Sequence, residues 1–289
     1  MMPISSQDML TEEVLPPRVG ELLVDAGKLT DIQLGQILKY QHEHACRFGE
    51  AAQALGLLSE EDLNAVLAQQ FAFSYLDGTD THLSPRLYMA FADQLMEKEK
   101  IKALRSQLQL SWLSQGHHSL LVGGVDGQEE RAVLAGNLAI AFSQLGLRTL
   151  LVDANLRGSS LPALLGGEHR IGLSDLLAGR CKASQVISAL SGLEDLYFLP
   201  SGTRAPNPQE LLSRKRMQVL VQELAHQFDV VIYHAPDQNE WYDAQILASL
   251  VGGVILQARR NRTPMPALAD MVARLRFIQV RVLGCVYVE

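Results

Sequence analysis

The chain has 289 residues, room for two domains or one large one, and its 47% hydrophobic and 20% charged composition is typical of a globular protein. A formal net charge of −7 argues against nucleic-acid binding, because the phosphate backbone attracts basic proteins. No basic region followed by an apolar segment opens the chain, and the longest weakly polar stretch, 247–258, is shorter than a membrane helix. We therefore expect a cytoplasmic protein with no direct membrane insertion.

An internal repeat fills the first quarter of the chain. Residues 18–41 align with residues 47–70, and eight of the 24 aligned positions are identical. Each copy reads as a short helix ended by Gly27 or Gly56, followed by a second helix capped by Thr30 or Ser59. We expect residues 1–14 to be disordered and residues 15–75 to form a small all-α domain. Leucines at i,i+4 spacing would pack its units together: Leu34, Leu38, Leu63 and Leu67.

The repeated pattern, R-x-G-x-x-x-x-x-x-G-x-L-x-x-x-x-L-x-x-x-L-x-x-Q, resembles the MshEN domain found at the N-terminus of secretion and pilus ATPases. Some members of that family bind cyclic di-GMP, so the resemblance implies contacts from Arg18, Gly20, Arg47 and Gly49. Arginine can stack on guanine and bind phosphate, and glycine allows close approach of the backbone. The alternative is a helical docking module whose glycines end helices and whose arginines form surface pairs.

Turn-forming residues gather after the repeat, and residues 76–96 read as a linker. A charged amphipathic helix is predicted over 97–113, and apolar strands alternate with helices from 119 onward. This alternation predicts an α/β domain over 97–289 with a mostly parallel, doubly wound sheet. Its helices are expected at 131–145, 174–190, 208–227, 242–251 and 264–278.

Four loops follow the predicted strands at their carboxyl ends, where such folds bind ligands: 123–131, 153–157, 234–237 and 259–263. In their order and flanking sequence, including "PNPQELLSR" (206–214), these loops resemble the bacterial tyrosine autokinases of polysaccharide synthesis, P-loop relatives of the MinD/ParA group. Together with the repeat, the chain resembles the EpsG-type exopolysaccharide chain-length-determinant kinases. The resemblance implies a protein-tyrosine kinase family and self-association through Glu99, Lys102 and Arg105.

The phosphate loop departs from that family's pattern. A P-loop needs backbone N–H groups around the phosphates, a lysine for the β- and γ-phosphates, and a hydroxyl for Mg²⁺. Aligned on residues 137–139, the lysine falls at Arg131, the Ser/Thr at Ala132, and two glycines at Gln128 and Glu130, while Gly127 remains in the loop. A carboxylate at 130 opposes a polyphosphate, and Ala132 cannot bind Mg²⁺.

The other nucleotide loops also differ from the family. Asp153 is the candidate catalytic carboxylate if the site is active, but Asn155 and His234 stand where the family has aspartates. No further ligand lies at metal-binding spacing from the pair His117–His118 or from His234, so we predict no metal site. The basic run 259–262 is more typical of a solvated loop than of a phosphate clamp.

Three functions remain open from the sequence. The first is a pseudokinase-like regulator of exopolysaccharide chain length or export that needs no cofactor and self-associates. It would bind the cytoplasmic segment of a membrane polysaccharide co-polymerase and so lie at the periphery of the inner membrane. The second is an active autokinase or ATPase that uses ATP and Mg²⁺. The third is a module that responds to cyclic di-GMP.

Overall fold

The computed structural model describes residues 20, 23–24, 27–44, 46–59, 76, 82–91, 96–158, 160–167, 170–236 and 241–288. The chain divides into two compact units, residues 1–73 and 74–289. The expected disorder of 1–14 falls outside the described residues.

The N-terminal unit is built from the described part of the repeat. Gly27 and Gly56 both adopt left-handed φ values, +68° and +65°, which glycine tolerates without a steric cost. Helix α2 (Asp31–His44) begins after a capping box, in which the Gln33 N–H donates to Thr30 Oγ1 and the Thr30 N–H donates to Gln33 Oε1. Helix α3 (Phe48–Ala54) follows and packs against α2.

The core of this unit differs from the predicted leucine stripe. Leu38 is 51% exposed, whereas Ile37 is fully buried. One residue along a helix turns the side chain by about 100°, so Ile37 occupies the inward position beside Leu34 and Leu38 faces outward. Leu63 and Leu67 lie outside the described residues.

The α/β unit contains a seven-stranded sheet. Its strands are β1 (Ser119–Gly124), β2 (Thr149–Asp153), β3 (Ser188–Ala189), β4 (Leu196–Leu199), β5 (Val230–His234), β6 (Gly253–Arg259) and β7 (Arg281–Val288). Its helices are α5 (Met96–Ser111), α6 (Gln128–Ser143), α7 (Leu161–Leu165), α8 (Leu173–Ala178), α9 (Ala183–Val186), α10 (Pro208–Leu212), α11 (Lys215–Gln227), α12 (Trp241–Val251) and α13 (Met265–Phe277), with 3₁₀ turns η1 (Tyr88–Ala90) and η2 (Leu113–Gln115).

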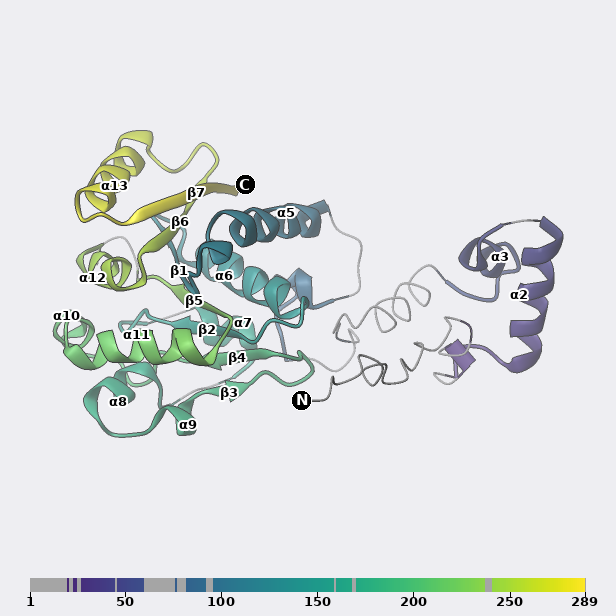
Figure 1. The fold of residues 1–289 in the computed structure, drawn as a ribbon, viewed down its shortest axis with the longest axis horizontal. Helices are drawn as coiled ribbons and strands as arrows, with labels where there is room; N and C mark the ends of the chain where they lie inside the picture. Colours follow the sequence, from purple (N-terminus) through teal and green to yellow (C-terminus); the bar gives the residue numbers. More distant parts are fainter. Residues whose placement is uncertain are drawn as a thin grey trace, which may run out of the picture. The chain divides into compact units, whose positions relative to one another are not determined.

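The sheet is doubly wound, as the sequence predicts. Its strand order is β3-β4-β2-β5-β1-β6-β7, and every pairing except β3 with β4 is parallel. Helices α11, α12 and α13 cover one face, and α5 and α6 cover the other (Figure 1). Along β1, Leu121 packs into one hydrophobic core while Leu120 and Val122 pack into the other. The central strands are buried on both faces, which explains their continuous apolar sequences.

Two predicted helices are wrong in extent. The helix expected over 174–190 is instead α8, α9 and the short strand β3, because Gly179 ends α8 in a left-handed conformation. The helix expected over 208–227 is α10 and α11, separated where Arg214 adopts an extended backbone. Helix α6 was expected to begin at residue 131 but begins three residues earlier, at Gln128.

Residues 82–91, assigned to a linker from the sequence, pack onto the α/β unit. Asn137 of α6 accepts a hydrogen bond from the Met89 N–H at 2.9 Å and donates to the Arg86 carbonyl at 2.9 Å. Leu87 lies against Gly136, where a Cβ atom would be 2.6 Å from Leu87 Cδ2. A glycine and an asparagine in α6 thus hold this segment in place.

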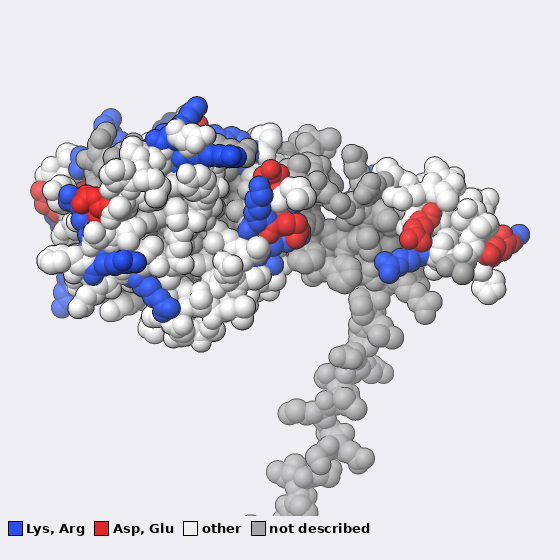
Figure 2. Space-filling view, turned by 90° about the horizontal axis from the view of Figure 1, so that it is seen from above, with Lys and Arg blue, Asp and Glu red and all other residues white. Residues whose placement is uncertain are grey.

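The face in Figure 2 carries basic and acidic side chains with wide uncharged areas between them. Across the described part of the chain, no helix is long and apolar enough to cross a membrane.

Candidate functional site

Four of the strand ends that the sequence singled out lie side by side. Strand β5 runs between β1 and β2, so His234 is opposite both Val122 and Asp153 in the register. On the other side of β1, Gly124 is opposite Gln257 of β6. The loops that follow these strands therefore meet at one edge of the sheet, where open α/β sheets bind ligands.

The connection from β1 to α6 is short. Only residues 125–127 separate the strand from the helix, and the Arg131 N–H already donates to the Gly127 carbonyl at 2.9 Å. Residues 128–130, which align with the phosphate loop, therefore form the first helical turn. A P-loop pattern places four residues between its two glycines, and those residues wrap around the phosphates.

A carboxylate occupies the space beside the start of this helix. Gly127 has a φ of +70°, and a Cβ atom there would lie 3.0 Å from Glu130 Oε2 and 3.1 Å from Arg259 Cδ. The Glu130 carboxylate thus folds back over the helix N-terminus, where the positive end of the helix dipole favours an anion. Glu129 instead faces outward and pairs with Arg86 at 3.1 Å.

An ion-pair cluster joins the loops after β1 and β6. Asp126 accepts hydrogen bonds from Arg259 Nη2 at 2.9 Å and from Thr263 Oγ1 at 2.6 Å, and Glu130 Oε1 lies 4.0 Å from Arg259 Nη1. Burial raises the pKa of Asp126, but the hydrogen bonds from Arg259 and Thr263 lower it more, so its pKa lies below the ordinary value. Arg259 is therefore engaged by two acidic side chains of the phosphate-loop segment.

Arg131, at the position of the family lysine, points into the protein. It is fully buried, and its Nη1 donates to the Asp126 carbonyl at 2.9 Å. Its Nη2 lies 3.5 Å from the Pro236 carbonyl. The guanidinium thus bridges two loops of the protein itself. The neighbouring Ala132 is also fully buried and carries no hydroxyl.

Asp153 and His234 form a buried pair. His234 Nδ1 lies 3.4 Å from Asp153 Oδ1, and both side chains have no exposed surface. The second carboxylate oxygen of Asp153 and Nε2 of His234 have no hydrogen-bond partner among the described residues. Asn155 Nδ2 donates to the Gly158 carbonyl at 2.5 Å, so this amide serves its own loop.

Sequence reasoning missed the partners that hold these loops. No sequence motif distinguishes Asp126, and the basic run at Arg259 is typical of a solvated loop, yet the two residues form an ion pair. Asp243, fully buried in α12, pairs with Arg157 at 3.2 Å and ties the loop after β2 to that helix. The one sequence signal for Asp126 is its place in the loop 123–131, which aligns with the phosphate loop of the kinase family.

The candidate residues for cyclic di-GMP are placed only in part. Gly20 is buried, and a Cβ atom there would lie 2.5 Å from Leu34 Cδ1, so helix packing by itself accounts for a glycine at this position. Arg47 is exposed, and its N–H donates to Glu50 Oε2 at 2.9 Å. Gly49 lies within α3, and Arg18 falls outside the described residues.

The three residues implied for self-association lie on α5. Glu99 and Lys102 pair with each other at 2.8 Å on its exposed surface. Arg105 donates to the Ala141 carbonyl of α6 at 2.7 Å, within the same unit. Arg105 therefore has a structural contact in a single chain.

Comparisons with known proteins find tyrosine-protein kinases among the relatives of this chain. No protein-family model matches it. Tyrosine-protein kinase YwqD of Bacillus subtilis is 29% identical over 66% of this chain and 80% of its own length. Tyrosine-protein kinase wzc of Salmonella typhi is 27% identical over 65% of this chain but only 26% of its own length, so the chain spans about a quarter of such relatives.

Solved structures agree with these sequence matches. The kinase domain of the Escherichia coli tyrosine kinase ETK is 26% identical, covers 66% of this chain and 74% of that one, and has a TM-score of 0.63. The homologues of this chain are therefore bacterial tyrosine-protein kinases, and its structural neighbours are the kinase domains of such enzymes together with MinD-like P-loop proteins.

Proposed function

We propose that this chain is a degenerate member of the exopolysaccharide tyrosine autokinases that acts by binding a partner and transfers no phosphoryl group. The observation that carries the proposal is the Glu130 carboxylate, which lies over Gly127 beside Arg259. This position at a helix N-terminus is where a phosphate group would bind. The protein supplies its own anion there.

The residues present do not fit a magnesium nucleotide, and their geometry supports the proposal. A bound nucleotide would need a cation that reaches its β- and γ-phosphates, but the Arg131 guanidinium is buried against backbone carbonyls. Magnesium would need a hydroxyl beside the phosphates, where Ala132 has a methyl group. Two unit charges 4 Å apart repel by about 4 kcal/mol at an effective dielectric near 20, so Glu130 would strongly weaken phosphate binding.

We infer a regulatory role in chain length or export from the homologues. The α/β unit would bind the cytoplasmic segment of a membrane polysaccharide co-polymerase and stay at the periphery of the inner membrane through that partner. Self-association through α5 belongs to the same proposal, with Lys102 and Glu99 exposed to a second copy. The N-terminal unit would receive the regulatory input, and cyclic di-GMP is its candidate ligand.

The proposal is tested by titrating the chain with ATP and Mg²⁺ in a calorimeter and assaying tyrosine phosphorylation in parallel. We expect no binding tighter than millimolar and no phosphotyrosine above a blank. Micromolar binding that is lost in Arg131→Ala would contradict the proposal and support the second candidate, an active autokinase, which the kinase homologues favour. The Arg276→Ala variant, altered in the last turn of α13, serves as the matched arginine control.

A further inference from the structure

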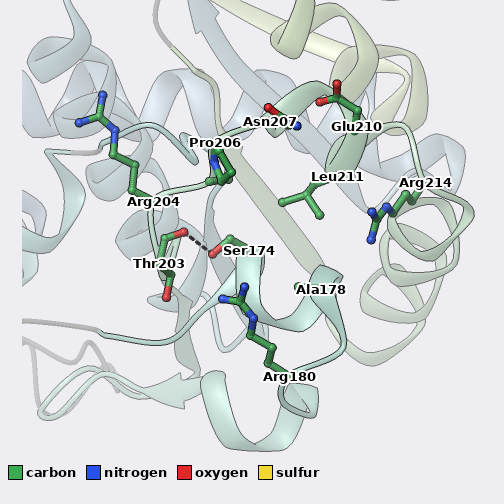
Figure 3. Close-up of a pocket in the computed structure, with 11 residues that line it drawn as sticks. Ser174, Ala178, Arg180, Thr203, Arg204, Pro206, Asn207, Glu210, Leu211 and Arg214 are labelled. Atoms are coloured by element: carbon green, nitrogen blue, oxygen red, sulfur yellow. Dashed lines mark hydrogen bonds between the residues drawn. The ribbon is translucent and has the colours of Figure 1, made fainter.

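A pocket of about 370 Å³ lies outside the carboxyl end of β4, and no part of the proposed function uses it. Its walls come from α8, from the segment that follows β4, and from the junction of α10 with α11 (Figure 3). The volume falls within the range of small-molecule sites. None of its lining residues belongs to the phosphate-loop segment.

A buried carboxylate makes the floor of this pocket rigid. Asp175 accepts hydrogen bonds from the N–H groups of Gly172 and Thr203 at 3.1 and 3.0 Å, and from Thr203 Oγ1 at 3.0 Å. It also pairs with Arg180 Nη1 at 3.2 Å. Ser174 Oγ donates to the Thr203 carbonyl at 2.6 Å, which joins α8 to the same segment. These bonds hold α8 against the segment that follows β4.

Arginine side chains stand on opposite rims of the pocket. Figure 3 shows Arg214 extending toward Leu211 and Arg180 extending toward Ser174, while Arg204 points away. Within the described ranges, the side chains of Arg214 and Arg204 have no ion-pair or hydrogen-bond partner. Glu210 is the one carboxylate of the lining, and in Figure 3 it is directed away from Arg180 and Arg214. The lining itself therefore carries excess positive charge, three arginines against one glutamate, with Arg180 also paired to Asp175.

The helix that begins at this rim adds to that charge. Helix α11 follows Arg214 with Lys215 and Arg216 in its first turn and no acidic residue there. Arg216 Nη1 lies 2.8 Å from the position of a Cβ atom on Gly179, next to Arg180. Basic side chains at a helix N-terminus oppose the helix dipole and are unfavourable in isolation. An anion at the rim would offset this repulsion.

We propose that the pocket binds a phosphate monoester. The phosphate dianion would lie between Arg180 and Arg214, because each guanidinium can donate two parallel N–H bonds to phosphate oxygens. The organic group would pack against Ala178, Ala205 and Leu211, which with Pro206 form the apolar part of the lining. This inference goes beyond the proposed function and does not depend on it.

Calorimetric titration of the full chain at low ionic strength tests the proposal with three probes: phenyl phosphate, glucose 1-phosphate and inorganic phosphate. We expect at least one ester to bind more tightly than inorganic phosphate, and the stronger of the two esters identifies an aromatic or a sugar ligand. Arg214→Ala removes no partner from the protein, and we expect about tenfold weaker binding, the modest loss typical of an exposed charge. Arg180→Ala should give a similar loss with an unchanged circular dichroism spectrum.

Two controls separate this pocket from other anion sites. Arg276→Ala removes an exposed arginine of α13, and Glu129→Gln changes an outward-facing residue of the phosphate-loop segment, and both should bind the ester as the unaltered chain does. The proposal is overturned if neither ester binds at millimolar concentration, if Arg214→Ala binds as tightly as the unaltered chain, or if Glu129→Gln changes the ester affinity. Inorganic phosphate binding as tightly as both esters would equally overturn it.

Discussion

Replacing Glu130 by glutamine tests whether its carboxylate keeps phosphate away from the start of α6. The substitution removes one negative charge and keeps the size of the side chain. At a distance of about 4 Å, the repulsion energy between that charge and a bound anion is about 4 kcal/mol at a dielectric of 20 and about 1 kcal/mol in bulk water. Glu130 is 29% exposed and Arg259 lies 4.0 Å away, so we place the effect near the lower limit, at about 1–2 kcal/mol. Pyrophosphate should then bind about five- to thirtyfold more tightly.

Calorimetry with pyrophosphate at neutral pH measures this gain, and Glu129→Gln is the matched control. Glu129 carries the same charge one residue away but faces outward to Arg86, so its loss should change the affinity by less than about twofold. Equal gains in both variants would mean that only net charge matters. Weaker binding in Glu130→Gln would refute the reasoning, because Glu130 would then assist the ligand.

Three further predictions concern stability and are measured by urea denaturation. Asp175→Ala should lower the free energy of unfolding by about 3 kcal/mol or more. Burial raises the pKa of Asp175, but hydrogen bonds from Thr203 and Gly172 lower it more. The stabilisation from Asp175 is therefore present above about pH 4 and declines as the pH falls toward the depressed pKa. If the Asp175→Ala variant lost stability in acid as the unaltered chain does, this prediction would be contradicted. Asn137→Ala should cost about 1–3 kcal/mol, because it frees the Met89 N–H, and an unchanged midpoint would exclude this role. Gly253→Ala should cost about 1–3 kcal/mol, because its Cβ would lie 2.5 Å from Trp112 Cζ2, and an unchanged midpoint would show that this contact does not limit the residue size.

The local pattern of the chain was sufficient for much of the fold. Apolar runs ending at Val122, Asp153 and His234 predicted parallel strands, and each is a buried strand of the sheet. Thr30 and Gln33 predicted a helix start, and their side chains form the capping box. These features depend on neighbours in sequence, because burial on both faces and capping leave a signature within a few residues.

Contacts between distant segments decided the rest. Asp126 and Arg259 are 133 residues apart, and only the pairing of β1 with β6 brings their loops together. Thr203 reaches Asp175 across 28 residues to build the floor of the basic pocket. The sequence by itself determined the sheet, its order of elements and the residue types at the phosphate-loop position. Tertiary structure decided where the charges of those residues lie, because a side chain's direction depends on the partner that packing places beside it.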